Sequence, residues 1–146
     1  ETVAAATGAD LFELVPSDPY TGADLNYNDN NSRVVYEHNH PEAREVELVS
    51  VTPEDWESYD TVFIGYPIWW HTAPMIIGTF LESYDLTGID IYPFTQSASM
   101  DTEQFENSME FVRKSAGNGT VHDGLFVDES DTEAIDSYLE NNRLIR

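Results

Sequence analysis

The side chains with the most evident chemistry lie in the Trp loop, the run Tyr66-Pro67-Ile68-Trp69-Trp70-His71. Adjacent side chains of an extended segment point in opposite directions, so Trp69 and Trp70 cannot both be buried on one side. We therefore expect one indole to face a surface cleft, where it can stack on a flat conjugated ligand. Packing of both tryptophans against neighbouring loops is the alternative that the residues leave open.

Histidines add titratable groups to the same region of the sequence. His71 directly follows the tandem tryptophans and could hydrogen-bond a ligand or relay a proton near neutral pH; an ordinary histidine at the rim of a cleft is the alternative. His38 and His40 form a His-x-His pair, a spacing that suits a metal site on a strand. Because their surroundings are typical of a loop or a weak helix, we expect solvated histidines there and no metal site.

A second polar loop, Thr95-Gln96-Ser97-Ala98-Ser99-Met100, is called the Gln loop. Each loop directly follows an apolar run typical of a buried parallel strand, at residues 61–66 and 89–94. The carboxyl ends of parallel strands lie at one edge of a sheet, and ligands bind there in open α/β folds. The sequence therefore predicts that both loops border the same ligand site.

Strands and helices alternate along the second half of the chain. We expect strands at residues 61–66, 89–94 and 121–127, and helices at 74–84, from Asp101 to Gly117, and from Asp131 onward. Earlier in the chain we expect a helix at 2–7 that ends at Gly8, a strand at 11–15, a long loop at 16–31 and a weak helix at 32–39. This alternation predicts βαβ units with right-handed crossovers. The expected fold class is therefore α/β, with three layers and an open parallel sheet.

Composition excludes several classes of function. The chain has 146 residues with 6 basic and 28 acidic side chains, a net charge of −22 at pH 7. Nucleic acid and anionic membrane surfaces are unsuitable partners, because both are bound through Lys and Arg. With no cysteine there are no disulfides, thiolate metal ligands or cysteine nucleophiles, and the redox compartment stays open. A hydrophobic fraction of 40% is enough for a packed core.

The termini and hydropathy bear on location. No apolar run approaches the roughly 20 residues that cross a bilayer, and Glu1 does not begin a signal peptide. We expect a cytoplasmic protein that has no membrane partner. The chain does not begin with Met, so we also expect it to be an excised or processed segment.

Several blocks of the sequence together resemble one protein family. The main block is Phe63-Ile64-Gly65-Tyr66-Pro67-Ile68-Trp69-Trp70, which is followed by Ala73-Pro74 and by Thr79-Phe80-Leu81-Glu82-Ser83-Tyr84-Asp85. Thr7-Gly8-Ala9-Asp10-Leu11-Phe12-Glu13-Leu14 and Tyr92-Pro93-Phe94 add agreement elsewhere. This pattern resembles the flavodoxin family, in its branch with a Gly-Tyr-Pro-Ile-Trp-Trp loop.

The resemblance implies an FMN-binding electron-transfer protein with strand order 2-1-3-4-5. It implies that the Trp loop lies along one side of the flavin ring and the Gln loop along the other. The implied cofactor-binding residues are Tyr66, Pro67, Ile68, Trp69, Trp70, His71, Thr95, Gln96, Ser97 and Ala98. Two alternatives remain: an NAD(P)H- or quinone-dependent flavin reductase, and a flavodoxin-fold module that has lost FMN.

The sequence departs from the family pattern in two places. Relatives carry a Gly-rich segment where this chain has the Gln loop, and the side chains of Ala98 and Met100 would restrict a close approach of backbone to a ring. The family's first strand and its phosphate loop are also absent from these 146 residues. We therefore expect one flavodoxin-like domain, residues 1–146, truncated at its N-terminus and lacking the central strand, with strand exchange into a homodimer as an open alternative.

The resemblance also gives the net charge a function. An acidic surface would steer the docking of a redox partner protein that has a basic surface. A general excess of acidic residues, as in a salt-adapted organism, is the alternative.

Overall fold

The computed structural model describes residues 1–40, 46–50, 52–69, 71–96, 101–128 and 130–145. The strands are β1 Thr61–Pro67, β2 Asp90–Gln96, β3 Thr120–Val121 and β4 Leu125–Phe126. The helices are α1 Thr2–Thr7, α2 Arg33–Asn39, α3 Met75–Glu82, α4 Thr102–Ser115 and α5 Thr132–Asn141, with a 3-10 turn at Trp56–Ser58.

The strands form one parallel sheet in the order β1-β2-β3, and β4 also pairs with β2. The register of β1 and β2 runs from Thr61 opposite Asp90 to Pro67 opposite Gln96. Both strands therefore end at the same level of the sheet. The prediction that the Trp and Gln loops leave one edge of a parallel sheet is confirmed at their described bases.

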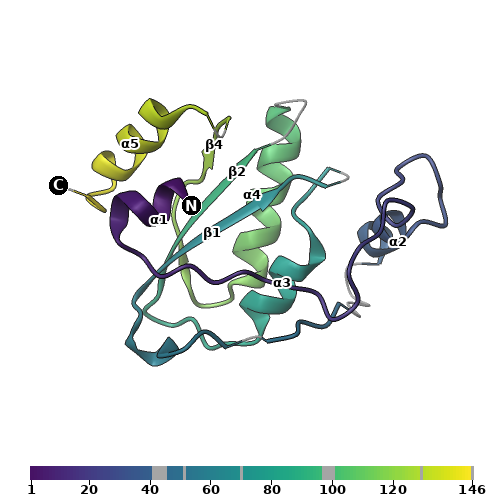
Figure 1. Cartoon of the computed structure of the whole chain (residues 1–146), viewed down its shortest axis with the longest axis horizontal. Coiled ribbons are helices and arrows are strands. Elements are labelled where there is room, and N and C mark those ends of the chain that lie inside the picture. The colour runs from purple at the N-terminus through teal and green to yellow at the C-terminus, as the bar shows by residue number, and fades with distance from the viewer. Residues whose placement is uncertain (41–45, 51, 70, 97–100, 129, 146) are drawn as a thin grey trace.

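Helices cover both faces of the sheet (Figure 1). On one face, α3 and α4 bury a large cluster that includes Ile64 of β1, Ile91 of β2 and Val112 of α4. On the other face, α1 and α5 form a smaller cluster around Leu139, with Phe63 and Phe94 of the strands packed against it. The α2 helix lies apart from these layers, to the right in Figure 1. The expected three-layer α/β arrangement is confirmed.

Capping residues fix the helix ends as the sequence predicts. The Asp101 carboxylate accepts hydrogen bonds from the backbone N–H groups of Glu103 (2.9 Å) and Gln104 (3.2 Å), and Asp131 accepts one from Ala134 at 3.0 Å. Gly8 ends α1 with a φ of 74°, which a residue without a Cβ adopts at little cost. Within the described residues, no helix is long and apolar enough to cross a membrane.

The expected strand at 121–127 is wrong in one respect, because it is broken into β3 and β4. Ile89, Ile91 and Thr95 turn their carbonyl groups toward this edge, where they accept bonds from Thr120, His122 and Val127. The backbone N–H and C=O groups of residues two apart in a strand face the same side. Pro93 lies between Ile91 and Thr95 in this series, so its nitrogen faces the same edge. Proline has no N–H to donate, and the break falls opposite it.

The expected strand at 11–15 is also wrong: these residues form no strand ladder. Leu11 is 69% exposed and Val15 40% exposed, although Leu14 packs against the larger core cluster. Pro16 makes an isolated antiparallel bridge to Leu48 instead. A strand is stabilised by the ladder that it shares with a neighbour, and in the described part of the chain β1 ends the sheet on its outer side. An apolar run without such a neighbour stays irregular.

Candidate functional site

The Trp loop begins with a side chain that belongs to the core. Tyr66 is 5% exposed, and its hydroxyl lies 3.1 Å from Ser108 Oγ of α4. Because the Ser108 hydroxyl itself donates to the Phe105 carbonyl at 2.7 Å, Tyr66 is the donor in this pair. Burial raises the pKa of Tyr66 to about 12, so the phenol remains a neutral donor. Its ring therefore packs beneath the loop, and Tyr66 has only its backbone to offer a ligand.

The bases of the two loops are tied together by hydrogen bonds. The Thr95 hydroxyl, buried at the end of β2, donates to the Tyr66 carbonyl of β1. The Ile68 N–H donates to the Gln96 carbonyl at 3.1 Å, which extends the contact one residue beyond the strands. The structure thus brings together Tyr66, Ile68, Thr95 and Gln96. Trp70, Ser97 and Ala98 of the predicted site lie outside the described residues.

The tip of the Trp loop is a tight turn. The Trp69 N–H donates to the Thr72 carbonyl at 2.9 Å, and the Thr72 N–H donates back to the Trp69 carbonyl at 3.3 Å. His71 has a φ of 69°, which is costly for a residue with a Cβ. Pro67 is exposed and Ile68 is buried at 9% exposure. The turn therefore presents Trp69 and His71 at the carboxyl end of β1.

Residues 16–40, here called the α2 segment, contact this turn. The Tyr20 and Trp69 rings meet edge to face with 5.1 Å between centroids, and the His38 and His71 rings lie 6.2 Å apart. Burial, followed by the neighbouring His71, lowers the pKa of His38. His38 therefore favours its neutral form. The sequence did not single out the α2 segment as part of the site.

Two charged residues of α2 complete this contact. Arg33 and Glu37 form an ion pair with 2.8 Å between Nε and Oε1, and both side chains are largely shielded, at 19% and 13% exposure. The spacing of four residues on an expected helix was the available signal for the pair. Nothing in the sequence indicated that it would lie against Tyr20, and so beside the Trp loop.

The His-x-His pair separates in the structure. His40 stacks on Tyr36 with 4.3 Å between centroids, and its Nδ1 lies 2.9 Å from the Tyr36 carbonyl oxygen, whereas His38 faces His71. Within the described ranges, no group of three or more histidine or carboxylate side chains is arranged to hold a metal ion.

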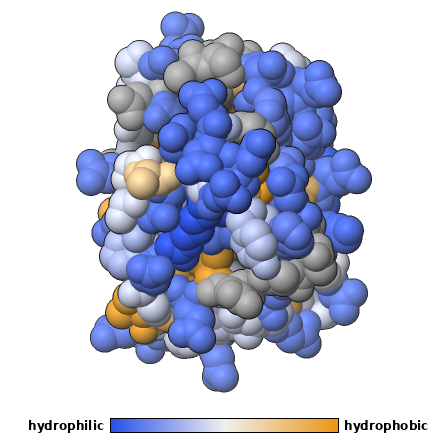
Figure 2. All heavy atoms as spheres, turned by 90° about the vertical axis from the view of Figure 1, so that its right-hand side faces the viewer, coloured by the Kyte–Doolittle hydropathy of each residue, from blue (hydrophilic) through white to orange (hydrophobic). Residues whose placement is uncertain are grey.

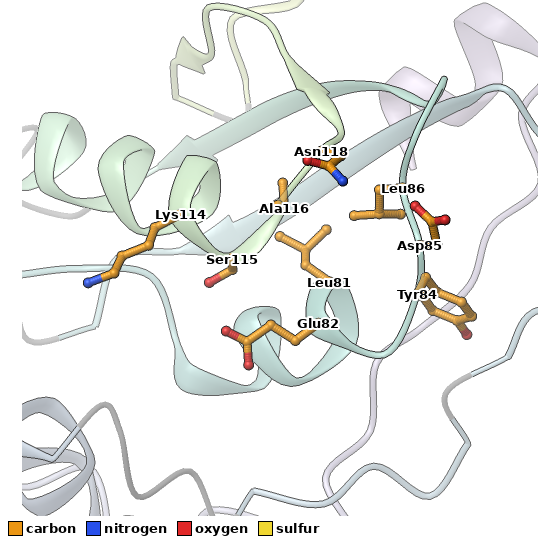
Figure 3. A pocket seen from close by; sticks show the side chains of 10 residues that line it. Leu81, Glu82, Tyr84, Asp85, Leu86, Lys114, Ser115, Ala116 and Asn118 are labelled. Carbon is orange, nitrogen blue, oxygen red and sulfur yellow. The ribbon is translucent and has the colours of Figure 1, made fainter.

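A shallow hollow of about 370 Å³ lies at the other end of the sheet (Figure 3). Its walls come from the C-terminal ends of α3 and α4, with Leu81, Glu82, Lys114 and Asn118 among them. The 14 residues of α4 separate it from the Gln loop by roughly 20 Å. The hollow is therefore distinct from the site at the carboxyl ends of the strands.

Comparison with known protein families decides the assignment. A family model described as Flavodoxin matches residues 1–142. The chain belongs to the flavodoxin family. The parallel sheet, the two covering helix layers and the loops at the carboxyl ends of β1 and β2 are consistent with this membership.

Solved structures of flavoproteins are similar to this chain. A candidate flavoprotein from Bacteroides eggerthii DSM 20697 is 37% identical, with a TM-score of 0.85 over 96% of this chain and 85% of that chain. Another from Bacteroides uniformis ATCC 8492 is 32% identical, with a TM-score of 0.83 over 95% and 86%. A flavoprotein from Lactobacillus acidophilus NCFM, solved in complex with FMN, shares the fold at 18% identity and a TM-score of 0.54 over 77% of this chain and 73% of that chain. No curated protein matches the chain significantly.

Proposed function

We propose that this flavodoxin-family protein binds FMN between the Trp and Gln loops and transfers electrons through it. The observation that carries the proposal is the shared base of the two loops, where Thr95 and Ile68 join the carboxyl ends of β1 and β2 beside Trp69. Family membership and the FMN complex of the Lactobacillus acidophilus flavoprotein support the choice of flavin.

The described residues suit the ring end of a flavin. An indole of the tandem tryptophans would stack on the ring, and backbone groups of the Trp loop would meet its polar edge. Among the described residues, Arg33 approaches this region through the Tyr20 ring, and it is already engaged by Glu37 and by the Asp18 carbonyl at 2.7 Å. Ring recognition, rather than charge pairing with the phosphate, is thus the contribution of these loops. When bound, FMN supplies the redox chemistry, and the protein orients it and tunes its potential.

Surface charge supports an electron-transfer role with a basic partner. The net charge is −22, and the face that carries α2 is dominated by hydrophilic residues (Figure 2). Glu103, Glu106 and Glu110 are exposed along α4, the helix that follows the Gln loop. We expect association with a basic redox protein to slow as salt is added.

Absorption spectroscopy tests the proposal directly. Titrating the purified protein with FMN should change the two-banded flavin spectrum saturably. The two loop variants Trp69→Leu and Trp70→Leu are compared with the control Trp56→Leu. The Trp56 indole packs against Phe80 and Tyr84. At least one loop variant should weaken binding about tenfold, because aromatic stacking on a base-like ring contributes about 1–3 kcal/mol. The Trp56 variant should bind as the wild type does.

The same samples separate the proposal from its rivals. Absence of any saturable FMN binding would reject the proposal and favour a module that has lost its cofactor. Steady oxidation of NAD(P)H in the presence of FMN would identify a reductase instead of an electron carrier.

A further inference from the structure

Tyr20 is held from two directions by charged residues of α2. Its hydroxyl donates to Glu37 Oε2 at 2.5 Å, and the Arg33 guanidinium carbon lies 4.0 Å from the centre of its ring. Arg33 is itself fixed by its ion pair with Glu37 and by a bond to the Asp18 carbonyl. The ring therefore has little freedom to rotate away from this arrangement.

Tyr20 also contacts the Trp loop. The edge-to-face contact with Trp69, at an interplanar angle of 67°, joins the α2 segment to the residue where the turn begins. That turn contains the positive φ of His71, so its conformation is not one that the local sequence favours. A strained turn persists when its surroundings hold it in place, and Tyr20 is part of those surroundings.

We propose that Tyr20 is a positioning residue for the flavin site, which holds Trp69 and with it the Trp loop in the arrangement that receives the ring. This inference rests on the proposed function. In this proposal Tyr20 acts through its contact with Trp69. When a binding-competent loop is only partly populated, the apparent affinity falls in proportion to that fraction. Loss of an aromatic contact changes such a population several-fold.

The Tyr20 hydroxyl keeps its proton over the ordinary pH range. Burial, together with the hydrogen bond to Glu37, raises the pKa of Tyr20 above its usual value. The phenol therefore stays a neutral donor toward Glu37 at pH values below this raised pKa.

Three variants of the full chain test the inference, with FMN as the probe. Tyr20→Ala should weaken FMN binding about fivefold and shift the reduction potential of the bound flavin. Tyr20→Phe keeps the ring beside Trp69 and should stay within about twofold of the wild type. Val34→Ala is the matched control. Val34 lies in α2 at 5% exposure, so its truncation should lower the melting temperature without removing the contact between Tyr20 and Trp69. Its affinity and potential should match those of the wild type.

A fourth measurement isolates the path of the effect. In a Trp69→Leu background, Tyr20→Ala should cause little further loss of affinity, because the contact that it removes is already gone. An equal loss in both backgrounds would overturn the inference, as would a Val34→Ala variant that weakens FMN binding as much as Tyr20→Ala does. Wild-type protein that binds FMN while Tyr20→Ala changes nothing would reject the positioning role alone. Failure of the wild type to bind FMN would reject the proposed function together with it.

Discussion

Substitution of Gly65 by alanine should disturb β1 through a single contact. A Cβ at this position would lie 2.7 Å from both Cε2 and Cζ of Phe94 on the neighbouring strand. The ring would have to move by about 0.7 Å to reach an ordinary 3.4 Å contact. Phe94 packs against the smaller core cluster with Phe63 and Leu125, so this movement disturbs other side chains.

The magnitude follows from two opposing effects. Overpacking of this kind costs about 1–3 kcal/mol. Alanine in a strand regains about 0.5–1 kcal/mol relative to glycine, because it loses less backbone entropy on folding. The net destabilisation of Gly65→Ala should therefore lie between about 0 and 2.5 kcal/mol, with a central value of about 1 kcal/mol. Gly22→Ala is the control, since no heavy atom lies within 4 Å of its Cβ position, and it should be neutral or slightly stabilising.

Urea unfolding followed by circular dichroism measures both variants. The midpoint of Gly65→Ala should fall at an unchanged m-value. A double-mutant cycle with Phe94→Leu identifies the cause. Once the Phe94 ring is removed, Gly65→Ala should change the unfolding free energy no more than Gly22→Ala does. The reasoning is refuted if Gly65→Ala matches Gly22→Ala in the wild-type background, or if its cost is the same with and without Phe94.

Two further predictions concern α4 and the core beneath the Trp loop. Asp101→Ala should lower the free energy of unfolding by about 1 kcal/mol, because two N–H groups of α4 lose their acceptor. Asp101→Asn keeps a side-chain oxygen and should stay close to the wild type. Equal losses for the two variants in denaturant titrations would contradict this explanation. Burial raises the folded-state pKa of Tyr66 from 10.0 to about 12. Its contribution to stability is therefore complete below pH 10 and is lost as the pH rises from 10 to 12, to a total of roughly 3 kcal/mol. The unfolding free energy of Tyr66→Phe should fall less steeply than that of the wild type across this interval, and parallel curves would show that Tyr66 does not titrate as described.

Much of the fold could be predicted from local signals. The caps at Asp101 and Asp131 are formed by groups within three residues of each carboxylate, so the sequence contains both partners. The continuous apolar run at 61–66 predicts a strand that is buried on both faces, and β1 confirms the strand but not the burial of both faces. Ile64 and Tyr66 are buried, whereas Gly65 between them is exposed. Tyr66 is buried on the same side of β1 as Ile64, two residues earlier, although the family resemblance implies Tyr66 as a cofactor-binding residue.

Other features depended on neighbours that lie far away in the sequence. The run at 11–15 has the residues of a strand, but a strand also needs a partner in register, and local composition does not supply one. The break between β3 and β4 arises because Pro93 turns its nitrogen toward that edge, a direction known only once the pairing is fixed.

The candidate site divides in the same way. The sequence by itself identified the Trp and Gln loops, because aromatic and polar residues directly after buried strands mark the carboxyl edge of a parallel sheet. It also determined the acidic charge, which is a sum over residues and needs no coordinates. Only the tertiary structure decided that Tyr20, held by Arg33 and Glu37, contacts Trp69. That contact joins segments on separate elements, and its geometry is set by how the α2 segment packs against the end of β1, which no local pattern encodes.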